Sequence, residues 1–251
     1  MTQSSLSTEQ LGTYRRTGHL TVPDFFSETA IDAVRADIDE WSDQFLSQLS
    51  PQQGRWFLEH ESRDARVLRK LDNPVYERPV FRRLAAEPHL LAAVEQLIGS
   101  GLRVWFSQVF LKPPGGGGPK PVHQDNFYFG PSDPDGVVTV WIALDDATSE
   151  NGCLCFVDGS NTGPVYPHEA PAGEPFNLQV PPEIASRFDM TAAPVPSGGV
   201  SFHHGNTLHQ SSANLSDRPR RAVAMHFVNR TTVFESPALD YDESVIVKLT
   251  D

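Results

Sequence analysis

The stretch 119-PKPVHQDNFYFG-130 places a histidine and an aspartate one residue apart, between a Gly/Pro-rich loop and an aromatic run. In an extended segment, residues i and i+2 point to the same side, about 6–7 Å apart along the backbone. His123 and Asp125 are therefore candidates to bind one ion, such as Fe(II), which accepts nitrogen and oxygen ligands. An isolated His-x-Asp triplet is more typical of a surface turn, so the hypothesis requires a third ligand elsewhere.

A candidate third ligand lies in the segment 202-FHHGNTLHQSSANLSDRPRRA-222. His209 would complete a set of two histidines and one carboxylate, which leaves three metal positions for a co-substrate and oxygen. Arg220 follows eleven residues later, and a guanidinium is the natural bidentate partner of a carboxylate. Arg221 is the alternative. Because side chains alternate along a strand, only one arginine faces inward, and the spacing favours Arg220.

The remaining histidines have simpler explanations. His203 and His204 are adjacent in a predicted strand, so at most one of them faces inward, where it would pack or contact a metal ligand. His226 is expected to pack in the following strand. Surface or packing positions are expected for the other four, which are His19, His60, His89 and His168.

Composition restricts the class of protein. The chain has 251 residues, is 39% hydrophobic and carries a net charge of −12. This length supports one sizeable core, and the absence of a basic stripe argues against a nucleic-acid partner. No run approaches the roughly 18 apolar residues of a membrane span, and residues 1–24 lack the pattern of a secretory leader. Two cysteines, Cys153 and Cys155, predict buried reduced thiols in a cytoplasmic protein.

The first hundred residues have helical patterns. A helix is predicted over 27–45, where apolar residues follow one face behind a capping Ser27. Another is predicted over 79–99, started by Pro79, broken or kinked at Pro88 and ended by Gly99. Residues 47–62 are expected to be irregular.

From about residue 102 the pattern changes to short β-rich runs bounded by Gly, Pro, Asn or Asp. Many short strands with polar turns predict a sandwich or barrel, with the helices packed on it in one unit. The loop 113–121 is too rich in glycine to be ordered by its own packing. The predicted strands are 102–111, 137–144, 153–157, 199–203 and 222–228.

The C-terminal 150 residues resemble the phytanoyl-CoA dioxygenase (PhyH-like) family of Fe(II)/2-oxoglutarate-dependent oxygenases, and 19-HLTVPDFFSETAIDAVRADID-39 resembles its N-terminal helix. The resemblance implies one oxygenase domain over 1–251: a double-stranded β-helix (jelly-roll, cupin-like) core over 101–251, with a mostly helical annex over 1–100. The matching C-terminal stretches are 111-LKPPG-115, 122-VHQDNFYF-129, 141-WIALDDATSENGCLCFVDGS-160 and 202–222.

The resemblance also implies roles for single residues. His123, Asp125 and His209 would bind Fe(II), and Arg220 would hold the distal carboxylate of 2-oxoglutarate. Further candidates for contact with the co-substrate or substrate are Trp141, Gln108, Lys70 and Ser211, and candidates for the substrate are Asn126, Phe127 and Tyr128. The chain has Asn161 where the family often has histidine. Related halogenases replace the carboxylate ligand with a small residue, so Asp125 favours oxygenation.

The implied activity is hydroxylation of an unactivated C–H bond of a small molecule, using O₂ and 2-oxoglutarate and releasing succinate and CO₂. Desaturation or cyclisation of a natural-product intermediate requires the same metal ligands. An alternative from another class is a cupin-like metal-binding protein without redox turnover, and a third is a zinc hydrolase. Neither alternative gives Arg220 a purpose.

Overall fold

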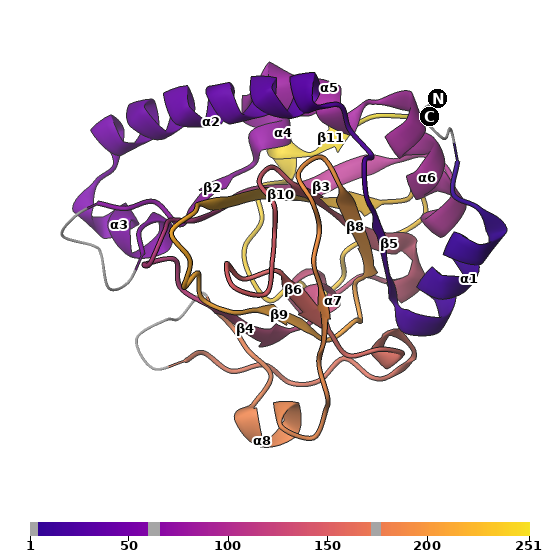
Figure 1. The fold of residues 1–251 in the computed structure, drawn as a ribbon. Helices are drawn as coiled ribbons and strands as arrows, with labels where there is room; N and C mark the ends of the chain where they lie inside the picture. The colour runs from indigo at the N-terminus through magenta and orange to yellow at the C-terminus, as the bar shows by residue number, and fades with distance from the viewer. Residues whose placement is uncertain (1–4, 60–65, 172–176) are drawn as a thin grey trace.

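The computed structural model describes residues 5–59, 66–171 and 177–251. Two antiparallel sheets face each other, and the N-terminal helices cover the outer face of the larger sheet (Figure 1). The predicted fold class, a jelly-roll core with N-terminal helices packed on it, is confirmed.

The larger sheet has the order β1-β8-β5-β10-β3-β11, with β2 also paired to β3, and contains seven strands in the part of the chain that is described. All of its pairings are antiparallel, which matches the short turns and hairpin signals of the sequence. The strands are β1 (His19–Val22), β2 (Lys70–Asp72), β3 (Arg103–Lys112), β5 (Val137–Ala143), β8 (Val200–His204), β10 (Arg220–Val228) and β11 (Val247–Lys248).

The smaller sheet has the order β4-β9-β6-β7. It closes the barrel opposite the larger sheet (Figure 1). Its pairing of β4 with β9 places His123 directly across from His209. The strands are β4 (Lys120–His123), β6 (Leu154–Phe156), β7 (Thr191–Ala193) and β9 (His209–Ser211).

Alternation along β10 separates the inside of the barrel from the core beneath the helices. Val223, Met225 and Phe227 are fully buried in the core that the sheet shares with the helices. Ala222 and Ala224 belong to a different cluster, inside the barrel, together with Trp141. The period of two therefore directs every second side chain of this strand into the barrel.

The helices begin and end where local signals place them. The helix α2 starts after Ser27, whose hydroxyl accepts a hydrogen bond from the amide of Ala30 at 3.3 Å, and buries the predicted face of Ile31, Val34 and Ile38. The helices are α1 (Thr8–Thr17), α2 (Glu28–Gln48), α3 (Pro51–Phe57), α4 (Pro74–Glu77), α5 (Pro79–Ala85), α6 (Pro88–Ile98), α7 (Asp125–Phe129) and α8 (Pro182–Ala185), with 3₁₀ turns at Pro134–Gly136, Ser160–Thr162 and Glu243–Val245.

Two expectations about the helices differ in outcome. The break predicted at Pro88 is present, because the helical region divides there into α5 and α6. The prediction of an irregular segment at 47–62 is wrong for its described part. Ser50 and Gln53 form a capping box that starts α3, a signal that was readable in the sequence. Residues 60–62 lie outside the described residues.

Five strands, β3, β5, β6, β8 and β10, follow the predicted runs with small shifts, whereas the other described strands were not predicted from the sequence. The strand predicted at 153–157 is shorter, since β6 contains Leu154 to Phe156 only. Cys153 therefore precedes the strand and is buried, whereas Cys155 is half-buried, and both thiols are free. The 113–121 loop is hydrogen-bonded to a neighbouring loop, from Gly115 N to Ser216 O at 3.1 Å and from Asn214 N to Gly117 O at 2.8 Å.

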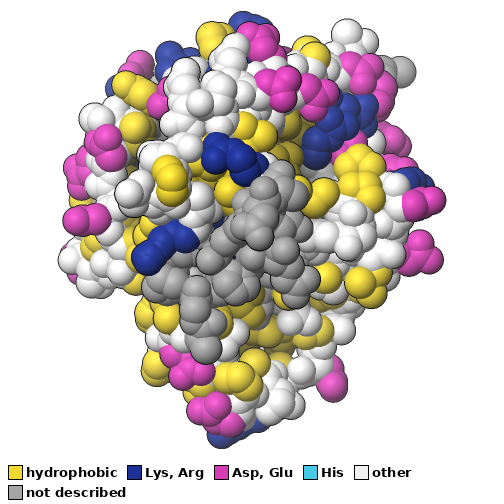
Figure 2. Space-filling model, turned by 90° about the vertical axis from the view of Figure 1, so that its left-hand side faces the viewer, with side chains coloured by type: hydrophobic (Ala, Val, Ile, Leu, Met, Phe, Trp, Pro, Cys, Tyr) yellow, Lys and Arg dark blue, Asp and Glu magenta, His cyan; other side chains and the backbone are white. Residues whose placement is uncertain are grey.

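The surface adds little to the choice of partner. Figure 2 shows the side of the molecule at the left of Figure 1, where the coloured Lys and Arg side chains are separated by hydrophobic and uncharged ones. Within the described residues, no helix combines the length and apolar character needed to cross a membrane.

The burial of α5 on the sheet generates a stability prediction. Phe81 is completely buried in the core shared by helices and sheet. Because Phe81→Ala leaves a large cavity, we expect the free energy of unfolding to fall by about 3–5 kcal/mol. Denaturant unfolding measures it, with Val233→Ala as the control: Val233 is 56% exposed, so its change should stay within about 0.5 kcal/mol. Equal losses in the two variants would contradict this placement of Phe81.

Candidate metal centre and co-substrate pocket

Two strands and one short helix bring three candidate ligands together. His123 ends β4, His209 begins β9, and Asp125 opens α7. The Nε2 atoms of both histidines lie 3.8 Å from Asp125 Oδ1, and one ligand atom of each residue can be chosen so that all lie within 4.8 Å of one another. All three are buried. The expected extended segment ends at Gln124, because the chain turns into the helix at Asp125.

The hydrogen bonds of the two imidazoles prepare them to bind a metal ion. His123 Nδ1 lies 2.8 Å from the carbonyl oxygen of Pro121, and His209 Nδ1 lies 2.9 Å from that of Thr207. A carbonyl oxygen can only accept a hydrogen bond, so each Nδ1 carries the proton and each Nε2 keeps a free lone pair. Burial lowers the pKa of His123 well below its usual value, which maintains this neutral form.

The carboxylate of Asp125 is held by its second oxygen. Oδ2 accepts a hydrogen bond from Thr139 Oγ1 at 2.5 Å and lies 3.2 Å from His203 Nε2, leaving Oδ1 for a metal ion. Burial alone would raise the pKa of Asp125, but the neighbouring His209, together with His203 and His226, holds it well below its usual range. The carboxylate is therefore ionised when it meets a cation.

Behind Asp125, a short relay of hydrogen bonds crosses the larger sheet. His226 Nδ1 lies 2.8 Å from Thr139 Oγ1. The hydroxyl already donates to Asp125, so it accepts from His226. Thr139 is the cross-strand partner of both His226 and His203. The sequence predicts that His226 only packs. It does pack, with its ring centre 4.7 Å from that of Phe129, but it also hydrogen-bonds to Thr139.

Two positioning contacts, those of Thr139 and His226, were thus missed in the sequence, whereas contact of an inward His203 with a metal ligand was one of the alternatives it left open. The sequence contains only a weak signal for the role of Thr139. Thr139 is two residues before Trp141 and shares its inward face, but only the register of three strands shows what it meets. The expectation that His203 and His204 face opposite ways is confirmed, since His204 Nε2 contacts Asp135 Oδ1 at 2.9 Å on the other side of the strand.

Inside the same barrel lies a buried arginine. Arg220 is 2% exposed, and its guanidinium carbon lies 5.6 Å from the centre of the Trp141 ring. Among the described residues, no carboxylate forms an ion pair with it, and its Nε has no hydrogen-bond partner. Burial lowers the pKa of Arg220 to about 10, so it is still cationic at neutral pH.

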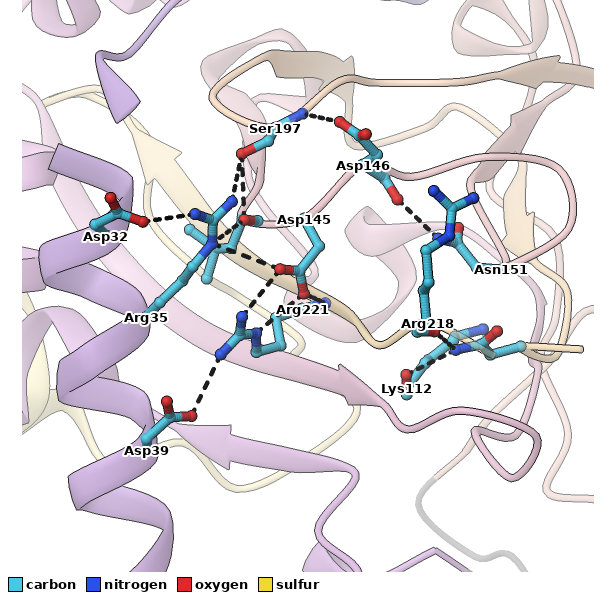
Figure 3. A network of polar contacts seen from close by, with 12 residues as sticks. Asp32, Arg35, Asp39, Lys112, Asp145, Asp146, Asn151, Ser197, Arg218 and Arg221 are labelled. Atoms are coloured by element: carbon cyan, nitrogen blue, oxygen red, sulfur yellow. Dashed lines mark hydrogen bonds and ion pairs between the residues drawn. The ribbon is translucent and has the colours of Figure 1, made fainter. Parts of the chain in front are cut away.

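The rival arginine points the other way. Arg221 donates from Nε to Asp145 Oδ2 at 3.0 Å and from Nη1 to Asp39 Oδ1 at 3.3 Å. Figure 3 shows this network between α2 and the sheet, with Arg35 also in contact with Asp32. Arg221 therefore attaches a helix to the outside of the barrel, and Asp145 belongs to a structural ion-pair site.

Lys70 and Gln108 both contact Asp72, a residue that was not singled out from the sequence. Lys70 Nζ lies 3.0 Å from Asp72 Oδ2, and Gln108 Nε2 donates to Asp72 Oδ1 at 2.8 Å. The charge of Lys70 is therefore already paired. Ser211 is buried, and its hydroxyl oxygen lies 2.9 Å from Lys112 Nζ.

The three substrate candidates on α7 differ in their contacts. Asn126 Nδ2 donates to Asn206 Oδ1 at 2.7 Å, and Tyr128 donates from its hydroxyl to the carbonyl of Leu178, also at 2.7 Å. Both side chains therefore hold the local fold. Phe127 is half-buried and stacks on His168 with ring centres 4.0 Å apart, which makes it the least constrained by polar contacts.

The contact between Thr139 and Asp125 generates a prediction about metal affinity. Thr139→Val keeps the shape but removes the hydrogen bond to Oδ2, and we expect Fe(II) to bind about 10- to 100-fold more weakly, as for other residues that orient a ligand. An anaerobic competition with a chelator measures the affinity. Ser201→Ala is the matched control, because it removes a buried hydroxyl that has no hydrogen-bond partner in the described part of the chain. Equal affinities in both variants would contradict the orienting contact.

Solved structures share this architecture. The non-heme α-ketoglutarate-dependent carbocyclase SnoK from nogalamycin biosynthesis superposes with a TM-score of 0.76 at 24% identity, covering 98% of this chain and 97% of its own. EctD from S. alaskensis, solved with 2-oxoglutarate and 5-hydroxyectoine, has a TM-score of 0.71 at 20% identity, with 92% and 79% covered. At these identities the likeness establishes the fold.

Sequence comparison identifies the family. Phytanoyl-CoA dioxygenase domain-containing protein 1 of Bos taurus is 34% identical over 166 residues, which are 63% of this chain but only 56% of that protein. A protein of Stutzerimonas stutzeri named "Probable alpha-ketoglutarate-dependent hypophosphite dioxygenase" is 27% identical over 223 residues, 87% of this chain and 77% of its own. A sequence model of the phytanoyl-CoA dioxygenase (PhyH) family matches residues 14–222. As the resemblance of its motifs indicated, the chain belongs to the phytanoyl-CoA dioxygenase family.

Proposed function

We propose that this protein is an Fe(II)- and 2-oxoglutarate-dependent dioxygenase that hydroxylates an unactivated C–H bond of a small molecule. The observation that carries the proposal is a buried arginine, Arg220, that has no ion pair among the described residues and lies in the same barrel as the His-Asp-His site. An unpaired buried cation is unfavourable unless an anion joins it. A 2-oxo acid with a second carboxylate supplies that anion and also chelates a metal ion.

The donor set fits Fe(II). His123 and His209 offer neutral imidazole nitrogens, and Asp125 offers one carboxylate oxygen, the combination typical of non-heme iron oxygenases. Zinc also accepts these donors, but a hydrolase would leave Arg220 without a purpose. When bound, Fe(II) with 2-oxoglutarate and O₂ supplies the oxidation, in which the co-substrate loses CO₂ and becomes succinate while a substrate C–H bond is hydroxylated.

The side chains of the barrel bind and orient. Arg220 holds the distal carboxylate of 2-oxoglutarate through charge-assisted hydrogen bonds, and the Trp141 ring beside it limits where the guanidinium can lie. Thr139 and His203 hold Asp125 so that one oxygen remains for the metal ion. Burial of all of these residues excludes water, which strengthens each of these interactions.

The alternatives differ in how well they use these residues. Desaturation or cyclisation would use the same metal ligands and Arg220. A cupin-like binding protein without redox turnover would use the His-Asp-His set but has no use for a buried arginine. Asp125 occupies the ligand position that a halogenase leaves open, which supports oxygenation.

The proposal also covers the domain organisation, the class of substrate and the location of the protein. One oxygenase domain over 1–251, with 1–100 as the helical annex, is supported by the core that helices and sheet share. A small molecule fits as substrate better than a nucleic acid, because the net charge is −12. The two free cysteines support a cytoplasmic location.

Co-substrate binding tests the proposal. Anaerobic addition of 2-oxoglutarate to the protein with Fe(II) should produce a weak visible charge-transfer band, and the band should be absent in His209→Ala. Arg220→Met removes charge-assisted hydrogen bonds of about 1.5–3 kcal/mol, so the dissociation constant of 2-oxoglutarate should rise about 10- to 100-fold.

Arg221→Met is the matched control, because it removes the neighbouring guanidinium from the outer face of the same strand. Its dissociation constant for 2-oxoglutarate should stay near that of the unchanged protein. Bound iron without any band in the unchanged protein would favour the non-redox binding protein instead.

A further inference from the structure

A second basic side chain lies beside Arg220. Lys112 is the last residue of β3, is 6% exposed and is the direct cross-strand partner of Arg220 on β10. Side chains directly opposite in an antiparallel pair lie on the same face, about 4.5–5.5 Å apart at Cβ, and like charges there destabilise a sheet. Two basic groups thus converge at one end of the barrel interior.

In the part of the chain that the structure describes, no carboxylate forms an ion pair with Lys112. Burial, followed by the charge of Arg220, lowers the pKa of Lys112 to about 6. Glu59, Cys153 and Cys155 also act on it, in the opposite direction, but none contacts Nζ. A neutral side chain would fill this position more favourably if the lysine had only to pack.

The ammonium group of Lys112 contacts the end of β9. Nζ donates to Ser211 Oγ at 2.9 Å and to the carbonyl oxygen of Ser212. An ammonium group has three donors and no acceptor. When Lys112 is charged, Ser211 Oγ therefore accepts from it, and the serine's own O–H must donate elsewhere. No acceptor for that O–H is found among the described residues.

The packing around Lys112 fixes its direction. A Cβ at Gly117 would lie 2.5 Å from the Cβ of Lys112, and one at Gly152 would lie 3.2 Å from Nζ. Two glycines thus allow two loops to close over the lysine, so its long side chain extends inward along the barrel toward β9.

We propose that Lys112 is a positioning residue for the co-substrate: its ammonium form, which the bound carboxylate favours, orients Ser211 so that the serine O–H donates to the carboxylate held by Arg220, and it adds a second positive charge there. This inference rests on the proposed function. It makes the distal end of the pocket selective for a 2-oxo acid that carries a second carboxylate.

The test compares two co-substrates under anaerobic conditions with Fe(II). 2-Oxoglutarate carries the distal carboxylate, and 2-oxobutyrate lacks it. In Lys112→Met, the dissociation constant of 2-oxoglutarate should rise about 10-fold, the effect of one charge-assisted contact, while that of 2-oxobutyrate should stay within about 2-fold. Lys248→Met, at an exposed lysine on β11, is the control and should change neither.

A double-mutant cycle separates orientation from simple support. If Lys112 acts through Ser211, Lys112→Met and Ser211→Ala must be less than additive in their effect on 2-oxoglutarate binding. Circular dichroism and bound iron verify the fold of each variant. If Lys112→Met does not fold, Lys112→Gln replaces it, because the amide keeps a donor for the Ser212 carbonyl without the charge.

The outcomes are distinguishable. Failure of the unchanged protein to bind 2-oxoglutarate overturns the proposed function and this inference with it. Normal binding in the unchanged protein together with equal binding in Lys112→Met overturns the inference alone. Equal weakening of both 2-oxo acids, or full additivity with Ser211→Ala, also overturns it, because it assigns Lys112 to general support of the barrel.

Discussion

The alternation of side chains along β10 is the constraint on which both the fold and the site depend. Val223, Met225 and Phe227 pack against the helices, and the residues between them face the barrel. A slip of one residue would exchange the two faces, placing Arg221 inside and Arg220 outside. The apolar packing beneath the helices therefore determines which arginine faces the interior of the barrel.

Inside the barrel, the acidic group has polar partners, whereas the basic groups have no ion pair among the described residues. Asp125 Oδ2 accepts a hydrogen bond from Thr139 Oγ1 and lies 3.2 Å from His203 Nε2. Arg220 and Lys112 lie across from each other, and neither has an ion pair within the described residues. Between Arg220 and His226, the inward residues of the strand are Ala222 and Ala224, which pack with Trp141. Within the described residues, one end of the interior groups three possible metal ligands, and the other end holds Arg220 without an ion-paired anion, which supports the proposed binding of a ligand with both a chelating and an acidic end.

Much of the site could be predicted because its chemistry depends on residue type and spacing. The pair His123 and Asp125, followed by His209 and then Arg220, is readable without coordinates, and the structure brings these four residues into one barrel. Strand positions followed from composition and turn residues, and the split at Pro88 from the geometry of proline. The helix α3 was also within reach, because its capping box is local.

The sequence by itself thus determined the five strands β3, β5, β6, β8 and β10, the helices α2, α5 and α6, and the residues whose chemistry is distinctive in isolation, since these depend on neighbours a few positions away. Only the tertiary structure decided which common residues serve them. Thr139 orients Asp125, and Lys112 meets Ser211, because strands far apart in the chain pair in one register. Asp72 likewise neutralises Lys70 only in the folded sheet. Contacts of this kind depend on long-range register, which a single sequence does not contain.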